Sequence, residues 1–129
     1  MFYKYNYFTQ EKLEEFFKDR KNWIIERTLK NSSKEELNFK SINLVVRYKK
    51  KFGLSIIAGR LLYSKPNFAK VKKYNSIEIG LLIKDKELIG NNKLGFYEDG
   101  VKGYVMPDEF NEIIAKLENN KKMLVALKL

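Results

Sequence analysis

The amino-acid sequence predicts an α+β domain, with an antiparallel sheet of about four strands and with an N-terminal and a C-terminal helix. Residues 41–49, 54–63 and 77–83 alternate between faces with a period of two, as half-buried strands do. Apolar residues recur at helical spacing over 10–30 and again over 107–117. Because 129 residues suffice for one hydrophobic core and not for two ordinary ones, the whole chain should form a single domain.

The N-terminal part is expected to contain a short strand followed by a long helix. Tyrosines alternate with other residues over 2–8, which favours a strand. Thr9 is a suitable N-cap, and acidic residues in the first turns complement the dipole of a helix predicted over 10–30. Residues 34–39 add a further helical turn or remain a loop; the pattern leaves both open.

The middle of the chain should form three strands joined by a tight turn and a basic loop. Residues 50–53 predict the hairpin turn between the first two strands. Gly59 indicates a bulge or a sharp bend in the second strand. Residues 64–74, with Pro66 and many lysines, are typical of a loop that leads to the third strand.

The C-terminal part should form a hairpin and then a helix. Asp99-Gly100 is the strongest turn dipeptide of the chain and predicts a hairpin within 94–106. Pro107 suits the first turn of a helix, and the acids that follow it complement the N-terminal end. Residues 123–129 fit either a last strand or continued helix.

The positive charge of the chain is concentrated in one segment. Residues 37–77 contain ten cations and no Asp or Glu, and they account for the whole net charge of +10, since the other 16 cations balance all 16 acids. Aromatic residues interleave with these cations, a combination suited to a phosphate backbone with exposed bases. Lysines outnumber arginines 22 to 4, which favours point contacts with phosphate over reading of base edges. A lysine-rich solvated surface without a ligand is the alternative interpretation.

The candidate nucleic-acid contacts in this segment are nine of its cations and one aromatic residue expected at the hairpin tip. They are Arg47, Lys49, Lys50, Lys51, Phe52, Arg60, Lys65, Lys70, Lys72 and Lys73.

Several tyrosines are candidate base-stacking rings, because every base offers a π-face. One group is the alternating row Tyr3, Tyr5 and Tyr7, for which strand packing is the competing explanation. Tyr48 and Tyr63 lie in the basic segment, and Tyr48 is the ring expected to be in the core.

The composition argues against an enzyme, a metal site and a cofactor. The chain contains neither Cys nor His, so thiolate ligands, imidazole ligands and the commonest general base are all absent. A Ser–Lys pair is left open. The acid pairs at 98–99 and 108–109 offer hard oxygen ligands, but a turn and a helix N-terminus are the stronger explanation of them. The glycines form no phosphate loop or dinucleotide fingerprint.

The segment Gly-Val-Lys-Gly-Tyr-Val-Met-Pro-Asp-Glu-Phe at 100–110, followed by Ile113, Ile114 and Leu117, resembles the end of small single-stranded-DNA-binding transcriptional coactivators related to the plant Whirly proteins. The resemblance covers the last quarter to third of the chain. It implies an antiparallel sheet followed by a helix, dimers that bind single strands on curved sheets, and a strand contact at Lys102.

We therefore expect a non-enzymatic protein that binds nucleic acid, in single-stranded form, through a basic, aromatic-rich sheet and loop. The sequence leaves open DNA versus RNA and a homodimer. A different class is also open: a small phage or mobile-element inhibitor that binds a host nucleic-acid-processing or defence enzyme. A structural subunit is a third. With no secretory signal and no apolar run long enough for a membrane span, a cytoplasmic protein without a membrane partner is the expectation.

Overall fold

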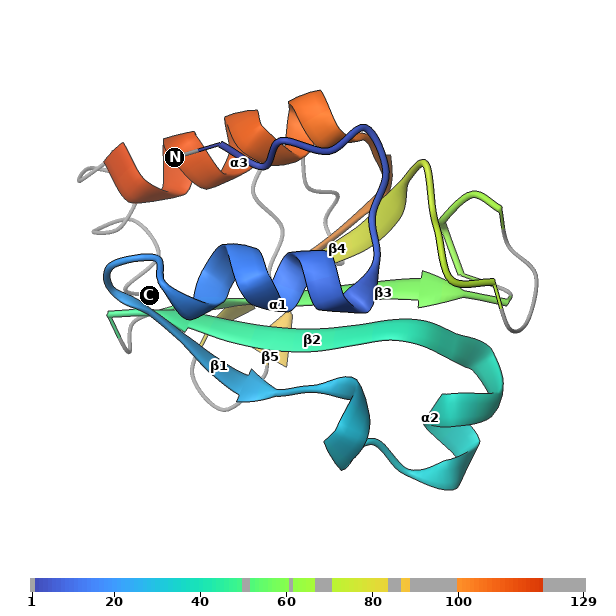
Figure 1. Ribbon diagram of the computed structural model, residues 1–129. Helices are drawn as coiled ribbons and strands as arrows, with labels where there is room; N and C mark the ends of the chain where they lie inside the picture. The colour runs from blue at the N-terminus through green and yellow to red at the C-terminus, as the bar shows by residue number, and fades with distance from the viewer. Residues whose placement is uncertain are drawn as a thin grey trace.

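The computed structural model describes residues 2–49, 52–60, 62–66, 71–83, 87–88 and 100–119. Helices α1 and α3 lie on one side of an antiparallel sheet, and α2 lies at its periphery (Figure 1). The elements are α1 (Gln10–Lys18), β1 (Trp23–Arg27), the 3₁₀ helix η1 (Leu29–Asn31), α2 (Lys34–Phe39), β2 (Lys40–Tyr48), β3 (Phe52–Gly59), β4 (Ile77–Ile83), β5 (Glu87–Leu88), β6 (Val101–Val105) and α3 (Pro107–Asn119).

The six strands of the described residues form one sheet with the order β1-β2-β3-β4-β5. Strand β6 also pairs with β4, beside the stretch Ile77–Gly80, whereas β5 pairs with β4 at Leu82 and Ile83. All the pairings are antiparallel. The predicted α+β class, with an antiparallel sheet and an N-terminal and a C-terminal helix, is confirmed.

Three element predictions match the structure closely. Strand β4 spans the predicted residues, and α3 begins at Pro107 as predicted and ends at Asn119. The irregularity expected at Gly59 is present, although the extra residue lies in β2: the register shifts between Lys40 and Ile42, opposite Gly59. A Cβ at Gly59 would overlap the Phe39 carbonyl oxygen, so this close approach requires glycine.

The long helix predicted over 10–30 is wrong, because α1 ends at Lys18 and a strand follows. Asn22 takes a left-handed backbone conformation (φ 73°) that turns the chain back. From Trp23 the burial alternates, with Trp23 buried, Ile24 exposed and Ile25 half-buried. The two adjacent isoleucines favour a strand, and β1 gains the backbone hydrogen bonds of pairing with β2.

The strand predicted over 2–8 is also wrong. In this fully described segment, ladder-like pairing is confined to one bridge, Phe8 to Tyr74. The segment runs beside α3 instead (Figure 1). The Asn111 side chain accepts a hydrogen bond from the Tyr3 backbone N–H (2.8 Å) and donates one to the Tyr3 carbonyl (3.1 Å). These reciprocal bonds satisfy both backbone groups of Tyr3 without a neighbouring strand.

The helices and the N-terminal segment enclose an aromatic cluster above the sheet. Phe110 of α3 has its ring centroid 5.6 Å from Tyr3, 5.6 Å from Phe8 and 5.4 Å from Phe16, in edge-to-face arrangements. Such pairs contribute about 0.5–1.5 kcal/mol each beyond the burial of area. This cluster joins the apolar faces of β2, β3 and β4 in one continuous core.

Glu118 ties the end of α3 to the corner between α1 and β1. Its carboxylate accepts hydrogen bonds from Arg20 Nη2 (2.6 Å), Arg20 Nε (2.7 Å) and Trp23 Nε1 (2.7 Å). Burial acts to raise the pKa of the Glu118 carboxyl, but the bonds from Arg20 and Trp23 and the charge of Arg20 outweigh it, and the pKa lies below its ordinary value.

The tip of the first hairpin differs from the prediction. Phe52 and Gly53 belong to β3, where they pair with Tyr48 and Arg47, so they are not part of the turn. The ring of Phe52 is 1% exposed and packs edge-on against Trp23 and Tyr48. The prediction that the Phe52 ring is exposed is therefore wrong. The expectation that Tyr48 lies in the core is confirmed.

Candidate nucleic-acid interface

Strand β3 divides the acid-free segment between opposite ends of the sheet. The hairpin tip precedes its first residue, Phe52, and the basic loop follows its last, Gly59. Eight residues at about 3.3 Å each separate the two ends by roughly 25 Å. The predicted contact residues of this segment that the structure describes therefore form two groups rather than one surface.

At the hairpin end, one of the two predicted contact cations that the structure describes is paired with an acid and the other is exposed. Arg47 forms an ion pair with Glu26, and its side chain is 13% exposed. Lys49 is exposed, with its ammonium 5.4 Å from the centre of the Tyr48 ring. Lys50 and Lys51 lie outside the described residues. Among the predicted contact residues that the structure describes at this end, Lys49 is the well-exposed one.

At the other end the described cations are exposed. These are Arg60, Lys65, Lys72 and Lys73, while Lys70 lies outside the described residues. Two backbone bridges hold this loop in place, one from Lys65 to Ser76 and one from Tyr74 to Phe8. The second bridge joins the loop to the N-terminal segment, so that cations and aromatic residues distant in sequence become neighbours.

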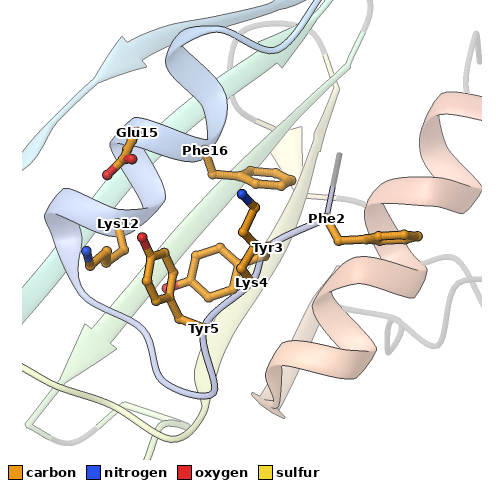
Figure 2. A pocket seen from close by; sticks show the side chains of 7 residues that line it. All are labelled: Phe2, Tyr3, Lys4, Tyr5, Lys12, Glu15 and Phe16. Atoms are coloured by element: carbon orange, nitrogen blue, oxygen red, sulfur yellow. The ribbon is translucent and has the colours of Figure 1, made fainter.

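Each of two half-buried tyrosines of the N-terminal segment faces a lysine. Figure 2 shows the Lys12 side chain beside that of Tyr5. Lys12 Nζ lies 4.3 Å from the centre of the Tyr5 ring, and Lys73 Nζ lies 4.7 Å from that of Tyr7. The two rings are 5.8 Å apart. A hydrogen bond with Tyr5 raises the pKa of the Lys12 ammonium, which therefore stays charged. Tyr3, the third member of the predicted row, is buried.

A second pair of tyrosines lies beside β6. Tyr63 is 57% exposed and Tyr104 is 48% exposed, and their ring centroids are 5.9 Å apart. Lys65 Nζ lies 5.7 Å from the centre of the Tyr104 ring. Lys102, the contact implied by the family resemblance, forms an ion pair with Glu109 (3.3 Å) and is mostly covered.

Met106, which is 59% exposed, connects the two pairs of tyrosines. It lines a groove of about 260 Å³ with Tyr5 and a groove of about 520 Å³ with Tyr104 and Lys65. We call the four rings of Tyr5, Tyr7, Tyr63 and Tyr104 the tyrosine band. Its rings come from the N-terminal segment, the loop after β3 and the end of β6, which leads directly into α3. Figure 1 places the N-terminal segment before α1, the loop after β3 and the start of α3 at the same end of the sheet.

Acidic groups also lie along the band. Asp108, in the first turn of α3, lines the same groove as Tyr5 and Met106. Glu78 accepts a hydrogen bond from the Tyr63 backbone N–H (3.0 Å), which holds that carboxylate beside the Tyr63 backbone. Of these two acids, Asp108 is the more exposed and lies where it would repel a bound phosphate.

The tyrosine band combines predicted and unforeseen residues. Tyr5, Tyr7 and Tyr63 were candidates for stacking on the sequence alone, and Lys65 and Lys73 were predicted cations. Lys12, Tyr104 and Met106 were not singled out as contacts, because tertiary contacts bring them to the band. The sequence held one signal of an irregular strand here, which is the glycine at 103 directly before the bulky Tyr104.

Comparisons with protein-family models, with curated proteins and with solved structures found no match to this chain. The resemblance of 100–117 to the Whirly-related coactivators therefore stays a prediction. Within the described ranges, no three acidic side chains are grouped as a metal site would require. None of the helices seen there has the length and apolar character needed to span a bilayer.

Proposed function

We propose that this protein is a non-enzymatic nucleic-acid-binding protein that holds single strands along the tyrosine band. The observation that carries the proposal is the pairing of rings with cations. Three of the four rings of the band have a lysine ammonium between 4.3 and 5.7 Å from the ring centre. Those lysines come from α1, from the loop after β3 and from the segment before β4.

The arrangement fits a single strand better than a duplex. Ammonium groups bind phosphates as point charges, and tyrosines stack on bases whose faces are free. In a duplex the faces are covered by neighbouring base pairs, so the rings would contribute little. Lysine contacts and stacking both tolerate any base, so we expect weak dependence on sequence.

The salt dependence of binding tests the electrostatic part. Five of the cations at this end of the sheet are Lys12, Arg60, Lys65, Lys72 and Lys73, and Lys4 lines the same groove as Tyr5. If all five contact phosphate, the slope of log affinity against log salt concentration on single strands should be about −3.5, from about 0.7 counterions released per contact. Fluorescence polarisation with single-stranded DNA, single-stranded RNA and duplex DNA measures it. A flat response or no binding removes the proposal and favours a protein target instead.

Two triple variants with the same change in net charge test whether nucleic acid binds along the tyrosine band. Replacing Lys65, Lys72 and Lys73 by Gln should reduce the slope by about 2 and weaken binding strongly. Replacing the exposed Lys18, Lys21 and Lys116 by Gln changes the net charge equally at positions outside the band. Equal losses in the two triple variants would mean that net charge alone, rather than the tyrosine band, attracts nucleic acid.

A further inference from the structure

Tyr104 holds a backbone conformation that bulky residues seldom adopt. Its φ is +53°, in the left-handed region. For an L-residue with a Cβ this conformation is unfavourable, and for a large side chain it is a genuine outlier. Such strained residues gather at functional sites, where the surrounding structure holds them in place.

A bulge in β6 produces this conformation and turns the ring outward. Lys102 pairs with Ile79 and Val105 pairs with Ile77, so two residues, Gly103 and Tyr104, lie opposite Glu78 alone. Val105 returns to the core and is fully buried, whereas Tyr104 is 48% exposed. Bulges of this kind often redirect a side chain beside a functional site.

Tyr63 packs against the same bulge. The Tyr104 backbone N–H donates a hydrogen bond to the Tyr63 carbonyl (2.8 Å) rather than to β4. A Cβ at Gly103 would lie 2.5 Å from the Tyr63 Cβ, so glycine at 103 allows the tyrosine to approach the strand. The relative position of the two exposed rings is thus built into the backbone.

A second unfavourable feature adjoins the same groove. Ser76 lines the groove of about 520 Å³ together with Tyr104, Lys65 and Met106. The Ser76 hydroxyl is buried, and it has no hydrogen-bond partner in the described part of the chain. Buried polar groups without partners are rare in folded proteins and call for an explanation.

From these observations we infer that Tyr63 and Tyr104 form a site for one unpaired nucleobase, with Lys65 placed to contact the adjoining phosphate. This inference rests on the proposed function and names its ligand at one position. Tyr63 is the more exposed of the two rings. The Lys65 ammonium lies over the ring of Tyr104. The base therefore stacks on Tyr63, with Tyr104 at its edge.

The experiment compares an intact single strand with a strand of the same length that contains only abasic sites, so that the phosphates are equal. One base–ring stack corresponds to about 5- to 150-fold in affinity. Tyr63→Leu should weaken binding of the intact strand within that range and leave binding of the abasic strand unchanged. Tyr63→Phe should retain wild-type affinity, because the ring is kept. Tyr104→Gly provides a second ring-removing variant that the backbone at position 104 favours.

The possible results distinguish a failure of the base site from a failure of the proposed function. If the wild type binds the intact strand but neither ring-removing variant loses affinity, or both lose it equally on intact and abasic strands, the base site is overturned and the electrostatic proposal stands. If the wild type binds neither strand, the proposed function fails and this inference fails with it. Phe39→Leu, which alters an exposed ring on α2, is the control and should change neither affinity.

Discussion

The strain at Tyr104 predicts an order of stabilities that ordinary side-chain truncation would not give. Tyr104→Gly and Tyr104→Ala both remove the contacts of the ring with Tyr63 and Lys65. The left-handed backbone costs about 1–2 kcal/mol with alanine and nothing with glycine. Glycine loses about 0.5–1 kcal/mol through the greater freedom of its unfolded chain. The glycine variant should therefore be the more stable by about 0.5–1 kcal/mol.

Urea unfolding followed by circular dichroism measures this difference directly, and the two melting temperatures should differ by about 2–5 °C in a domain of this size. Both variants should weaken binding of single strands to the same extent, because both lack the ring. If the alanine variant equals or exceeds the glycine variant in stability, Tyr104 does not hold a left-handed backbone in solution. Backbone strain at Tyr104 would then be absent and could not mark a functional site.

Three further predictions concern other parts of the molecule. Phe52→Ala should reduce the free energy of unfolding by about 3–5 kcal/mol, because the ring is buried, while the folded protein binds single strands as before; calorimetry and polarisation check both. Asp108→Asn should strengthen single-strand binding, most at low salt, since it removes an acid from a groove of the band; a loss of affinity would place the strand elsewhere. The depressed pKa of Glu118 means that its stabilising effect is present above the ordinary carboxyl pKa of 4.5 and is lost as the pH falls through the lower folded value. The difference in melting temperature between wild type and Glu118→Gln should therefore shrink below pH 4.5, and a constant difference would show that the charge of Glu118 is not responsible.

Strands and helices with a consistent period were predictable from the sequence. β4 places Ile77, Ile79 and Leu81 at alternate buried positions, and α3 combines Pro107 with an apolar stripe, so local pattern and tertiary environment agree there. The long helix predicted over 10–30 was wrong because the apolar residues of α1 and β1, taken together, follow helical spacing. The left-handed turn at Asn22, which separates them, depends on a backbone conformation that the spacing does not reveal.

The candidate site was predictable only in part, for a different reason. The sequence indicated basic character and candidate rings, including Tyr63 and Lys65. It did not indicate that β3 would separate Lys49 from the loop, or that Arg47 would be paired with Glu26. Such facts depend on strand register, which links residues far apart in sequence. The exposed ring expected at Phe52 was wrong because β3 begins at this residue, whereas the strand was predicted to begin at Leu54.

The ties between α3 and the beginning of the chain impose an order on folding during synthesis. Asn111 meets Tyr3 across 108 positions, and Glu118 meets Arg20 across 98. At about 5–20 residues per second, the ribosome needs roughly 5–20 s to produce the partners of the N-terminal aromatic residues. Throughout that interval the rings of Phe16 and Phe17 have no Phe110 to cover them, and apolar surface left uncovered in this way promotes aggregation.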